Sequence, residues 1–472
     1  MDSPRVGLVT FGDARDHEWE VVFRRLAVPL HNDAVSYFQS MPIELHASAD
    51  VARTKQEIYD QVDKLRALDV DCLVAHLPCW TAPNLVVLAV QRLAVPTILV
   101  SNRSMATHGS VALLGAGGAL DQIGYQHLRV RDDFSGDEVR NATLPLMRAA
   151  SAVRRLRGQV FGLFGGRSIG IDTGTIDPMQ WRRMFGIDVE HIDQLEIIRR
   201  ADMMADERAA DAVDWLTSRV GNVAYDGRAL TPERLAYQVK CYLATKEIIA
   251  EKSLDFIAIQ DLPELAANHI PQCVSAALVP SPYDAEGPKA PIAMACEADG
   301  DGALSMQMLK LVSGGIPPFF ADLSYLNDKT GTIYLPNCGA LCSWYAARSS
   351  DPAQNLNQIE LRPSIRTGGG ATFYFKAAPG PMTLARLFRK SGQYHMAILS
   401  GETVEPGADE YAAFVEARGK HQLPTAFVKV EADLDELVRT FGSNHISGVA
   451  GVFVRELKAL CELLDITPEL LT

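Results

Sequence analysis

The chain has 472 residues, of which 47% are hydrophobic and 22% charged, and it carries a net charge of −13. This composition is typical of a globular protein, and at roughly 150 residues per domain the length predicts about three domains. An acidic chain without clusters of Lys and Arg is a poor candidate for binding nucleic acid. No apolar run approaches the roughly 18 residues that would cross a membrane.

The N-terminus and the cysteines favour a cytoplasmic location. The first residues lead directly into a predicted strand and lack the apolar segment of a signal peptide. The eight cysteines are spread along the chain, mostly in apolar segments, as in proteins of a reducing compartment.

Residues 1–155 alternate between strand and helix patterns. Buried strands are predicted at 5–10, 71–76 and 96–100, and a helix within 49–68. Continuous apolar strands separated by helices predict a parallel sheet that is covered on both faces.

The same pattern restarts at Gly158 and predicts a second α/β domain over 156–315. Its predicted strands and long helix are 159–164, 189–192, 231–252 (the helix) and 254–260. After residue 315, short apolar runs alternate with Gly, Pro and Asn at 332–335, 371–376, 382–385, 395–399 and 426–430. Close turn spacing predicts an antiparallel β-barrel domain over 316–472, closed by a helix at about 449–464. The expected fold class is therefore α/β, with two N-terminal Rossmann-like domains with parallel sheets followed by a C-terminal antiparallel β-barrel domain.

Three acids, Glu297, Asp299 and Asp301, lie where a predicted strand at 291–295 gives way to a predicted helix at 303–311. Capping of the helix N-terminus explains one acid at such a place. Three clustered carboxylates repel one another unless a cation or a shared proton offsets their charge. A divalent metal is the simplest cation that would do so.

His445 lies in the segment 441–446, which we expect to be a loop-to-helix junction. An isolated His is more often a structural group, and Ser443 and Asn444 have the character of helix caps. Combined with Glu297 and Asp299, however, the imidazole completes an oxygen-and-nitrogen ligand set. Such a set suits Mn²⁺, with Mg²⁺ or Co²⁺ as substitutes, better than a thiolate-type zinc site.

Three glycine clusters invite a nucleotide-binding interpretation. The clusters at 115–118 and 165–168 are better explained as tight turns between strand and helix, so a dehydrogenase is disfavoured. The third, at 368–370, predicts a bulge or a close approach of the backbone. Arg362 and Arg366 precede it and would either donate to substrate oxygens or be surface charges.

Longer motifs carry a more specific signal when they are taken together. They are VFGLFGGRS at 160–168, DPMQW at 177–181, DVEHID at 188–193, SPYDAEGPK at 281–289, CEADGDGAL at 296–304, NCG at 337–339 and GSNH at 442–445. With these motifs the chain resembles the L-fucose isomerase / L-arabinose isomerase superfamily, and most of all its fucose-isomerase-like branch. The resemblance implies two α/β domains before a β-barrel domain, and a homo-oligomer (hexamer or trimer) with sites at subunit contacts. It also implies Mn²⁺-dependent interconversion of an aldose and its 2-ketose.

Carried over by position, the resemblance implies that Glu297 or Asp299 binds the metal together with His445. A further acid is expected from the loop after the strand that ends at Gln260, where Asp261 and Glu264 are the candidates and Glu264 is favoured. We assign Glu264 and Glu297 as the acid/base pair. Glu297, Asp299 and His445 are assigned to the metal. Of the two acids, one is expected to bind the metal and the other to contact a ligand. The segment 320–326 lacks the second metal-binding His of arabinose isomerases, which favours the fucose-type ligand set.

The expected substrate contacts are Trp80, Arg362, Arg366 and Asn444. Trp80 follows a strand end of the first domain, where α/β sites open. The expected function is a metal-dependent aldose–ketose isomerase acting on an open-chain sugar, L-fucose-like or another aldose, through a cis-enediol intermediate. One alternative is an enzyme on the same scaffold for a modified sugar, branched or sulfonated. Another is a non-catalytic cytoplasmic sugar-binding protein.

Overall fold

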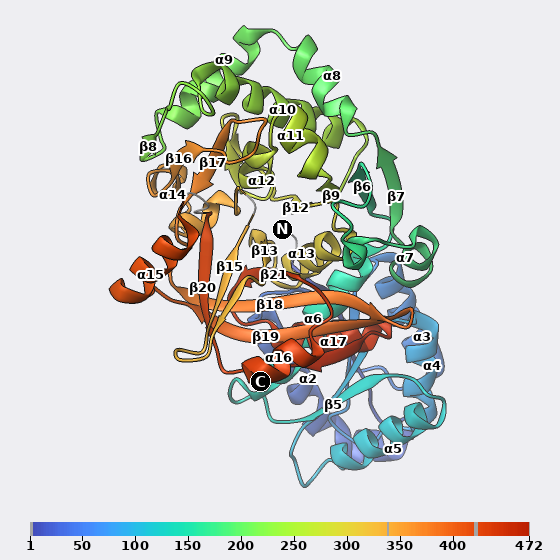
Figure 1. Cartoon of the computed structure of the whole chain (residues 1–472). Coiled ribbons are helices and arrows are strands. Elements are labelled where there is room, and N and C mark those ends of the chain that lie inside the picture. The colour runs from blue at the N-terminus through green and yellow to red at the C-terminus, as the bar shows by residue number, and fades with distance from the viewer. Residues whose placement is uncertain (1–2, 338, 420–422, 472) are drawn as a thin grey trace. The chain divides into compact units, whose positions relative to one another are not determined.

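The computed structural model describes residues 3–337, 339–419 and 423–471, and the chain divides into two compact units, Met1–Arg154 and Arg155–Thr472 (Figure 1). The three-domain boundaries stay predictions, since the predicted boundary at 315/316 lies inside the second unit. None of the described helices is both long and apolar enough to cross a membrane. The described cysteines form no disulfide, and Cys338 lies outside the described residues.

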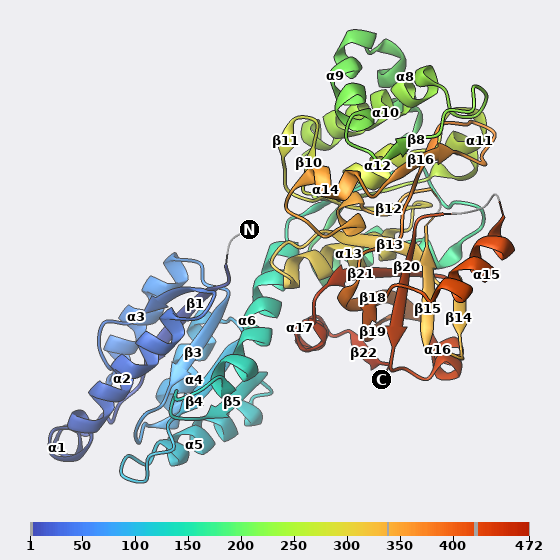
Figure 2. The same ribbon diagram turned by 90° about the vertical axis from the view of Figure 1, so that its left-hand side faces the viewer.

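The first unit is built around a parallel sheet of five strands in the order β2-β1-β3-β4-β5 (Figure 2). Its elements are β1 Arg5–Thr10, α1 Asp16–Glu18, η1 Trp19–Phe23, α2 Arg24–Gln39, β2 Glu44–Ala47, α3 Lys55–Ala67, β3 Cys72–His76, α4 Pro83–Leu93, β4 Thr97–Ser101, α5 Gly109–Gln122, β5 His127–Arg131 and α6 Glu138–Leu156. Apolar side chains of α3, α4 and α5 form one core with β1, β3 and β4, so these helices cover one face of the sheet. The predicted parallel sheet is confirmed.

The glycine cluster at 115–118 lies inside α5, so its interpretation as a turn is wrong. The surrounding Ala and Leu residues continue the helix through it. Gly117 packs beneath the guanidinium of Arg129 on β5, which would have to move to admit a Cβ there.

The second unit begins with a parallel sheet of four strands in the order β12-β9-β6-β7. Its elements are β6 Val160–Phe164, η2 Asp172–Gly174, α7 Pro178–Phe185, β7 Asp188–Ile192, α8 Leu195–Met203, α9 Asp206–Thr217, α10 Pro232–Glu251, β9 Phe256–Ile259, η3 Asp261–Leu265, α11 Ala266–Asn268, α12 Cys273–Leu278, β12 Ala293–Cys296 and α13 Gly300–Val312. Since β7 and β9 lie on opposite sides of β6, the strand order reverses between β6 and β9. In open α/β sheets such a switch point opens a crevice at the carboxyl ends of the strands.

The remaining large sheet has eight strands and forms an antiparallel half-barrel, in the order β13-β21-β18-β19-β20-β15-β14, with β22 added in parallel to β19. Its strands are β13 Pro318–Asp322, β14 Tyr325–Asn327, β15 Thr332–Pro336, β18 Gly380–Lys390, β19 Gln393–Thr403, β20 Thr425–Val430, β21 His445–Ala450 and β22 Thr467–Leu470. The helices of this part are η4 Ser343–Ala346, α14 Pro352–Leu356, α15 Ala408–Arg418, α16 Leu434–Thr440 and α17 Val454–Leu464. The predicted fold class, parallel sheets followed by a C-terminal antiparallel sheet, is confirmed.

Two small sheets complete the second unit. They are the hairpin of β10 Tyr283–Asp284 with β11 Gly287–Pro288, and a three-stranded sheet of β8 Asn222–Val223, β16 Glu360–Pro363 and β17 Ala371–Tyr374. Most of the run at 371–376, which we expected in the barrel, therefore pairs elsewhere, and Lys376 alone bridges Thr425 of the half-barrel. The close backbone approach predicted at 368–370 is confirmed, because a Cβ at Gly368 would lie 2.7 Å from the carbonyl oxygen of Ala266.

Helix α13 is the element that joins the two large sheets of this unit. It packs against β12 and β9 on one side and against β13, β18 and β21 on the other (Figure 1). Residues 300–310 are all buried, which explains the small and apolar character of this helix. The turn between β12 and α13 therefore lies where the parallel sheet meets the half-barrel.

Candidate metal centre

The acidic turn after β12 has an unusual backbone. Glu297 and Ala298 both adopt left-handed conformations, with φ of 57° and 54°. Such a conformation costs an L-residue roughly 1–2 kcal/mol, and strained residues of this kind cluster at functional sites. Asp299 then caps the helix, because its side chain accepts a hydrogen bond of 2.8 Å from the amide of Gly302.

His445 is the first residue of strand β21, and the expected loop-to-helix junction is wrong. The helix that we expected from about 449 begins only at Val454. The segment from His445 to Ala450 pairs with both β13 and β18, and these ladder hydrogen bonds outweigh its local preferences. The register places His445 directly opposite Asp322 of β13.

Glu297, Asp322 and His445 form the one group of three metal-type ligands found among the described residues. One ligand atom from each lies within 4.8 Å of the others. His445 Nε2 is 3.0 Å from Glu297 Oε2 and 3.4 Å from Asp322 Oδ1.

Two atoms of this group are placed as ligands of one cation would be. Glu297 Oε2 and His445 Nε2 are both buried and lie 3.0 Å apart, and neither makes a hydrogen bond of good geometry in the described parts of the chain. Buried polar atoms are rarely left in this state. A divalent cation would satisfy both atoms, and two carboxylates with one imidazole are ligands that Mn²⁺, Mg²⁺ and Co²⁺ accept.

Asp299 stands behind His445 and is not part of the group of three. Its Oδ2 accepts hydrogen bonds from His445 Nδ1 at 2.7 Å and from Arg386 Nη1 at 2.6 Å. Burial alone would raise the pKa of Asp299, but the Arg386 charge and the His445 hydrogen bond outweigh it and lower the pKa to about 2. Burial disfavours charge on His445 as well, yet the hydrogen bond to Asp299 and the nearby carboxylates of Asp322 and Glu297 raise its pKa well above the ordinary value. The site therefore attracts positive charge.

Asp261, one of the two candidates for a further acid, lies close enough to the group for the charge of Glu297 to act on it. It is buried at the start of η3 and accepts a hydrogen bond of 3.1 Å from the amide of Gln272. Burial, reinforced by the negative charge of Glu297, raises the pKa of Asp261 to about 7. Glu264, which the sequence favoured over Asp261, is instead exposed and bonded to Gln260 at 2.7 Å.

Comparisons with known proteins identify the family. The model for "L-fucose isomerase, first N-terminal domain" matches residues 3–158, and the model for "L-fucose isomerase, C-terminal domain" matches residues 335–470. The chain belongs to the L-fucose isomerase family. As a member of this family it is an aldose–ketose isomerase, and the resemblance that the sequence motifs indicated is confirmed.

The similar curated proteins are sulfoquinovose isomerases. The isomerase is 26% identical to the one from Alkalicoccus urumqiensis over 325 residues, which cover 67% of this chain and 69% of the relative. It is 26% identical to the one from Clostridium sp. (strain MSTE9) over 329 residues, which cover 68% and 67%. The protein from Priestia aryabhattai is 19% identical, with 76% and 78% covered.

Among solved structures, the isomerase shares 13% identity with a periplasmic solute binding protein from Actinobacillus succinogenes 130z with bound D-allose. The match covers 56% of this chain and 79% of that one, and its TM-score of 0.17 is too low to support an inference.

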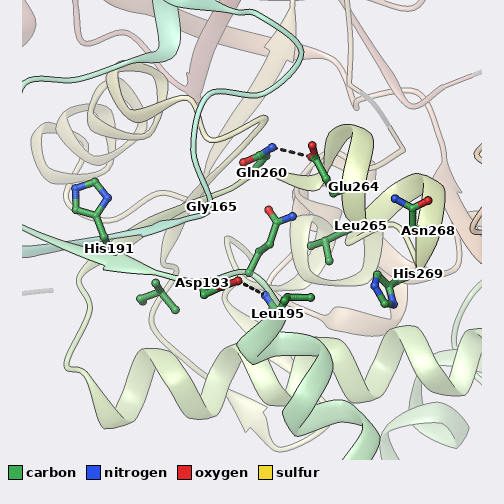
Figure 3. A pocket seen from close by; sticks show the side chains of 11 residues that line it. Gly165, His191, Asp193, Leu195, Gln260, Glu264, Leu265, Asn268 and His269 are labelled. Atoms are coloured by element: carbon green, nitrogen blue, oxygen red, sulfur yellow. Dashed lines mark hydrogen bonds between the residues drawn. The ribbon is translucent and has the colours of Figure 1, made fainter.

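A cavity of about 610 Å³ lies at the carboxyl ends of β6, β7 and β9, next to the switch point (Figure 3). Gly165, Asp193, Gln260, Glu264 and His269 are among its lining residues. The amide of Gly166 donates to Gln260 Oε1 at 2.6 Å, so this turn amide already has a partner. The loop that starts at Gln260 thus faces the cavity with Gln260 and Glu264 and carries Asp261 on its buried side.

The predicted substrate contacts lie in different surroundings. Trp80 belongs to the first unit, where it packs against a cluster with Trp19 and Phe23. Arg362 pairs with Glu360 at 2.6 Å and lies over the ring of Tyr374, which fits the surface-charge alternative.

Arg366 and Asn444 lie in the second unit. The positive charge of Arg366 acts on Asp261 and lowers its pKa, which opposes the effect of burial. Asn444 is exposed next to His445, and its side chain accepts a hydrogen bond of 3.3 Å from Thr173. A role of these residues in binding sugar stays a prediction.

Sequence reasoning missed Asp322. Asp322 lies in the segment 320–326, for which we considered only the lack of a second His. The available signal was an acid at the end of an apolar strand, since Glu297 also follows such a strand.

Proposed function

We propose that the isomerase uses a divalent metal and converts an open-chain, sulfonated aldose to its ketose. The metal dependence rests on the buried, facing atoms Glu297 Oε2 and His445 Nε2, which make no hydrogen bond of good geometry, and on Asp322 beside them. The sulfonated substrate rests on the relatives, since the similar curated proteins are sulfoquinovose isomerases. An unmodified aldose such as L-fucose is the second candidate, because both matching family models are those of L-fucose isomerase.

Glu297, Asp322 and His445 would hold the metal, and we propose Mn²⁺ because carboxylate ligands suit it and the family resemblance implies it. A bound divalent cation polarises neighbouring sugar oxygens and stabilises the negative charge that develops during enolisation, by several kcal/mol.

The chain's own contribution is to move one proton from C2 to C1 of the sugar. The negative charge of Glu297 acts on Asp261, and we assign the transfer to these two acids. With a pKa of about 7, Asp261 is present both with and without its proton near neutral pH, as a group that gives and takes protons must be. Asp261 therefore replaces Glu264 in the acid/base pair, because Glu264 is exposed and bonded to Gln260.

The test is a turnover assay with defined metal content. The protein is stripped with a chelator, dialysed and supplied with Mn²⁺, Mg²⁺ or Co²⁺, and ketose formation from sulfoquinovose, L-fucose and L-arabinose is followed by NMR. We expect turnover of sulfoquinovose that disappears with chelator and returns with Mn²⁺. Turnover of L-fucose alone would refute the sulfonated substrate, and turnover that ignores the chelator would refute the metal.

A further inference from the structure

Arg386 is a fully buried guanidinium in the middle of strand β18, and no proton transfer proposed above uses it. Its Nη1 donates to Asp299 Oδ2 at 2.6 Å, and its Nη2 donates to the carbonyl oxygen of Thr173 at 2.8 Å. Both side chains of the Arg386–Asp299 pair have an exposed fraction of 0%. A buried ion pair is an expensive way to stabilise a core, since apolar side chains of similar volume often do as well. The pair therefore calls for a reason other than stability.

We propose that Arg386 is a positioning residue for the candidate metal centre, acting through Asp299 to hold the His445 ring with Nε2 towards Glu297 and Asp322. The proposal rests on the proposed metal dependence. Metal-binding histidines commonly donate their second N–H to a carboxylate, which fixes both the tautomer and the orientation of the ring. Arg386 extends this arrangement by one further residue.

The polar atoms of Asp299 leave it no freedom to turn. Its Oδ1 accepts from the amide of Gly302, while its Oδ2 accepts from both Arg386 and His445. Because Oδ2 is shared by two donors, the guanidinium fixes the point at which the imidazole Nδ1 must lie. The ring is then held from one edge by Asp299 and packs against Phe320, with ring centroids 4.7 Å apart.

Two glycines next to the Arg386–Asp299 pair leave the space that its side chains occupy. A Cβ at Gly302 would lie 2.8 Å from Arg386 Nη1 and 2.9 Å from Asp299 Cγ. A Cβ at Gly174 would lie 3.1 Å from the Asp299 Cα. Two glycines, one on α13 and one on η2, thus leave the space in which the guanidinium reaches the carboxylate.

Strand β18 is also tied to α13 beside Arg386. The amide of Leu387 donates to Ser305 Oγ at 2.8 Å, and Ser305 in turn donates to the carbonyl oxygen of Asp301 at 2.7 Å. The guanidinium is therefore held in a fixed position relative to the helix that carries Asp299. Since Arg386 already balances the charge of Asp299, the negative charge that faces the cation comes from Glu297 and Asp322.

The test measures metal binding and needs no substrate. Mn²⁺ affinity is determined by calorimetry for the metal-free full-length wild type, Arg386→Met and Arg386→Lys, with Lys390→Met as the control. Lys390 is an exposed cation at the end of the same strand, where it pairs with Glu469. We expect Arg386→Met to bind Mn²⁺ about 10-fold more weakly, the lower end of the range for losing a direct partner of a metal-binding residue, because Arg386 acts on His445 through Asp299. Arg386→Lys should recover part of this loss, and Lys390→Met should bind like wild type.

A spectroscopic readout separates positioning from a general effect on folding. The visible spectrum of the Co²⁺-loaded protein reports the ligand field, and it should shift in Arg386→Met but not in Lys390→Met. If Arg386→Met fails to fold, Arg386→Lys takes its place, because it keeps the positive charge but lacks the planar fork of donors that bonds Asp299 and Thr173 together. Arg386→Lys with a Mn²⁺ affinity within twofold of wild type and an unchanged Co²⁺ spectrum would then overturn the positioning role.

The possible outcomes distinguish this inference from the proposed function. Wild-type protein that binds no Mn²⁺, Mg²⁺ or Co²⁺ would overturn both. Wild-type protein that binds Mn²⁺, with variants at Arg386 within twofold of its affinity and an unchanged Co²⁺ spectrum, would overturn the positioning role alone.

Discussion

The buried carboxyl of Asp301 gives a prediction whose size can be worked out. Asp301 lies in the first turn of α13, where its Oδ1 accepts a hydrogen bond of 3.0 Å from Tyr394. Its Oδ2 is 3.4 Å from Arg389 Nε and has no hydrogen-bond partner of good geometry among the described residues. Burial raises the pKa of Asp301 from 3.8 to about 7, although the charges of Arg389 and Arg386 act in the opposite direction.

The raised pKa makes the folded protein less stable as the pH rises. Between pH 4 and 7 the folded state holds a proton on Asp301 that the unfolded state has released, so unfolding releases a proton and is favoured by higher pH. A pKa difference of about 3 corresponds to about 4 kcal/mol, at about 1.4 kcal/mol per pH unit. This contribution to the free energy of unfolding is complete at low pH and is lost progressively up to about pH 7.

Asp301→Asn removes the titrating group and keeps the shape of the side chain. We expect the variant to match wild type at pH 4.5 to within about 1 kcal/mol, and to exceed it by up to about 4 kcal/mol at pH 8. Urea unfolding of chelator-treated protein, followed by circular dichroism at several pH values, measures the difference. Asp409→Asn, an exposed acid on α15, is the control. A constant difference between Asp301→Asn and wild type from pH 4.5 to 8 would refute the reasoning.

Three further outcomes follow from the site. His445→Ala should lose stoichiometric Mn²⁺ in metal analysis and should lose turnover, because the imidazole ligand is gone; full metal content would exclude His445 as a ligand. Asp261→Asn should lower kcat by about 10²–10⁴-fold and remove the dependence of kcat on pH near 7. Glu264→Gln should keep the wild-type kcat and its pH dependence. If instead Glu264→Gln lost activity and Asp261→Asn kept it, Glu264 would be the acid, as the sequence favoured. Gly302→Ala should lower the free energy of unfolding by about 1–3 kcal/mol through overpacking, while Gly118→Ala, where a Cβ meets nothing within 4 Å, should be neutral or stabilising, as thermal unfolding would show.

The order of elements could be predicted because it depends on local patterns. Runs such as 71–76 and 159–164 are apolar on both faces, and only a sheet covered on both faces accommodates such strands. The prediction for the segment 445–450 was wrong because a short stretch such as HISGVA does not by itself distinguish a strand from a loop or a helix start. Its pairing with β13 and β18, distant in sequence, decided that it is a strand.

The candidate site divides in the same way. The amino-acid sequence determined that an acidic turn follows a buried strand and that the chain resembles sugar isomerases, because motif and residue type are properties of a continuous stretch. Only the resemblance, and not the pattern itself, linked His445 to the acidic turn. The tertiary structure decided that Asp322 joins Glu297 and His445, that Asp299 stands behind the imidazole with Arg386, and that Asp261 rather than Glu264 is buried near the acids. These choices depend on strand register, helix capping and burial, which arise only when segments far apart in the chain are packed together.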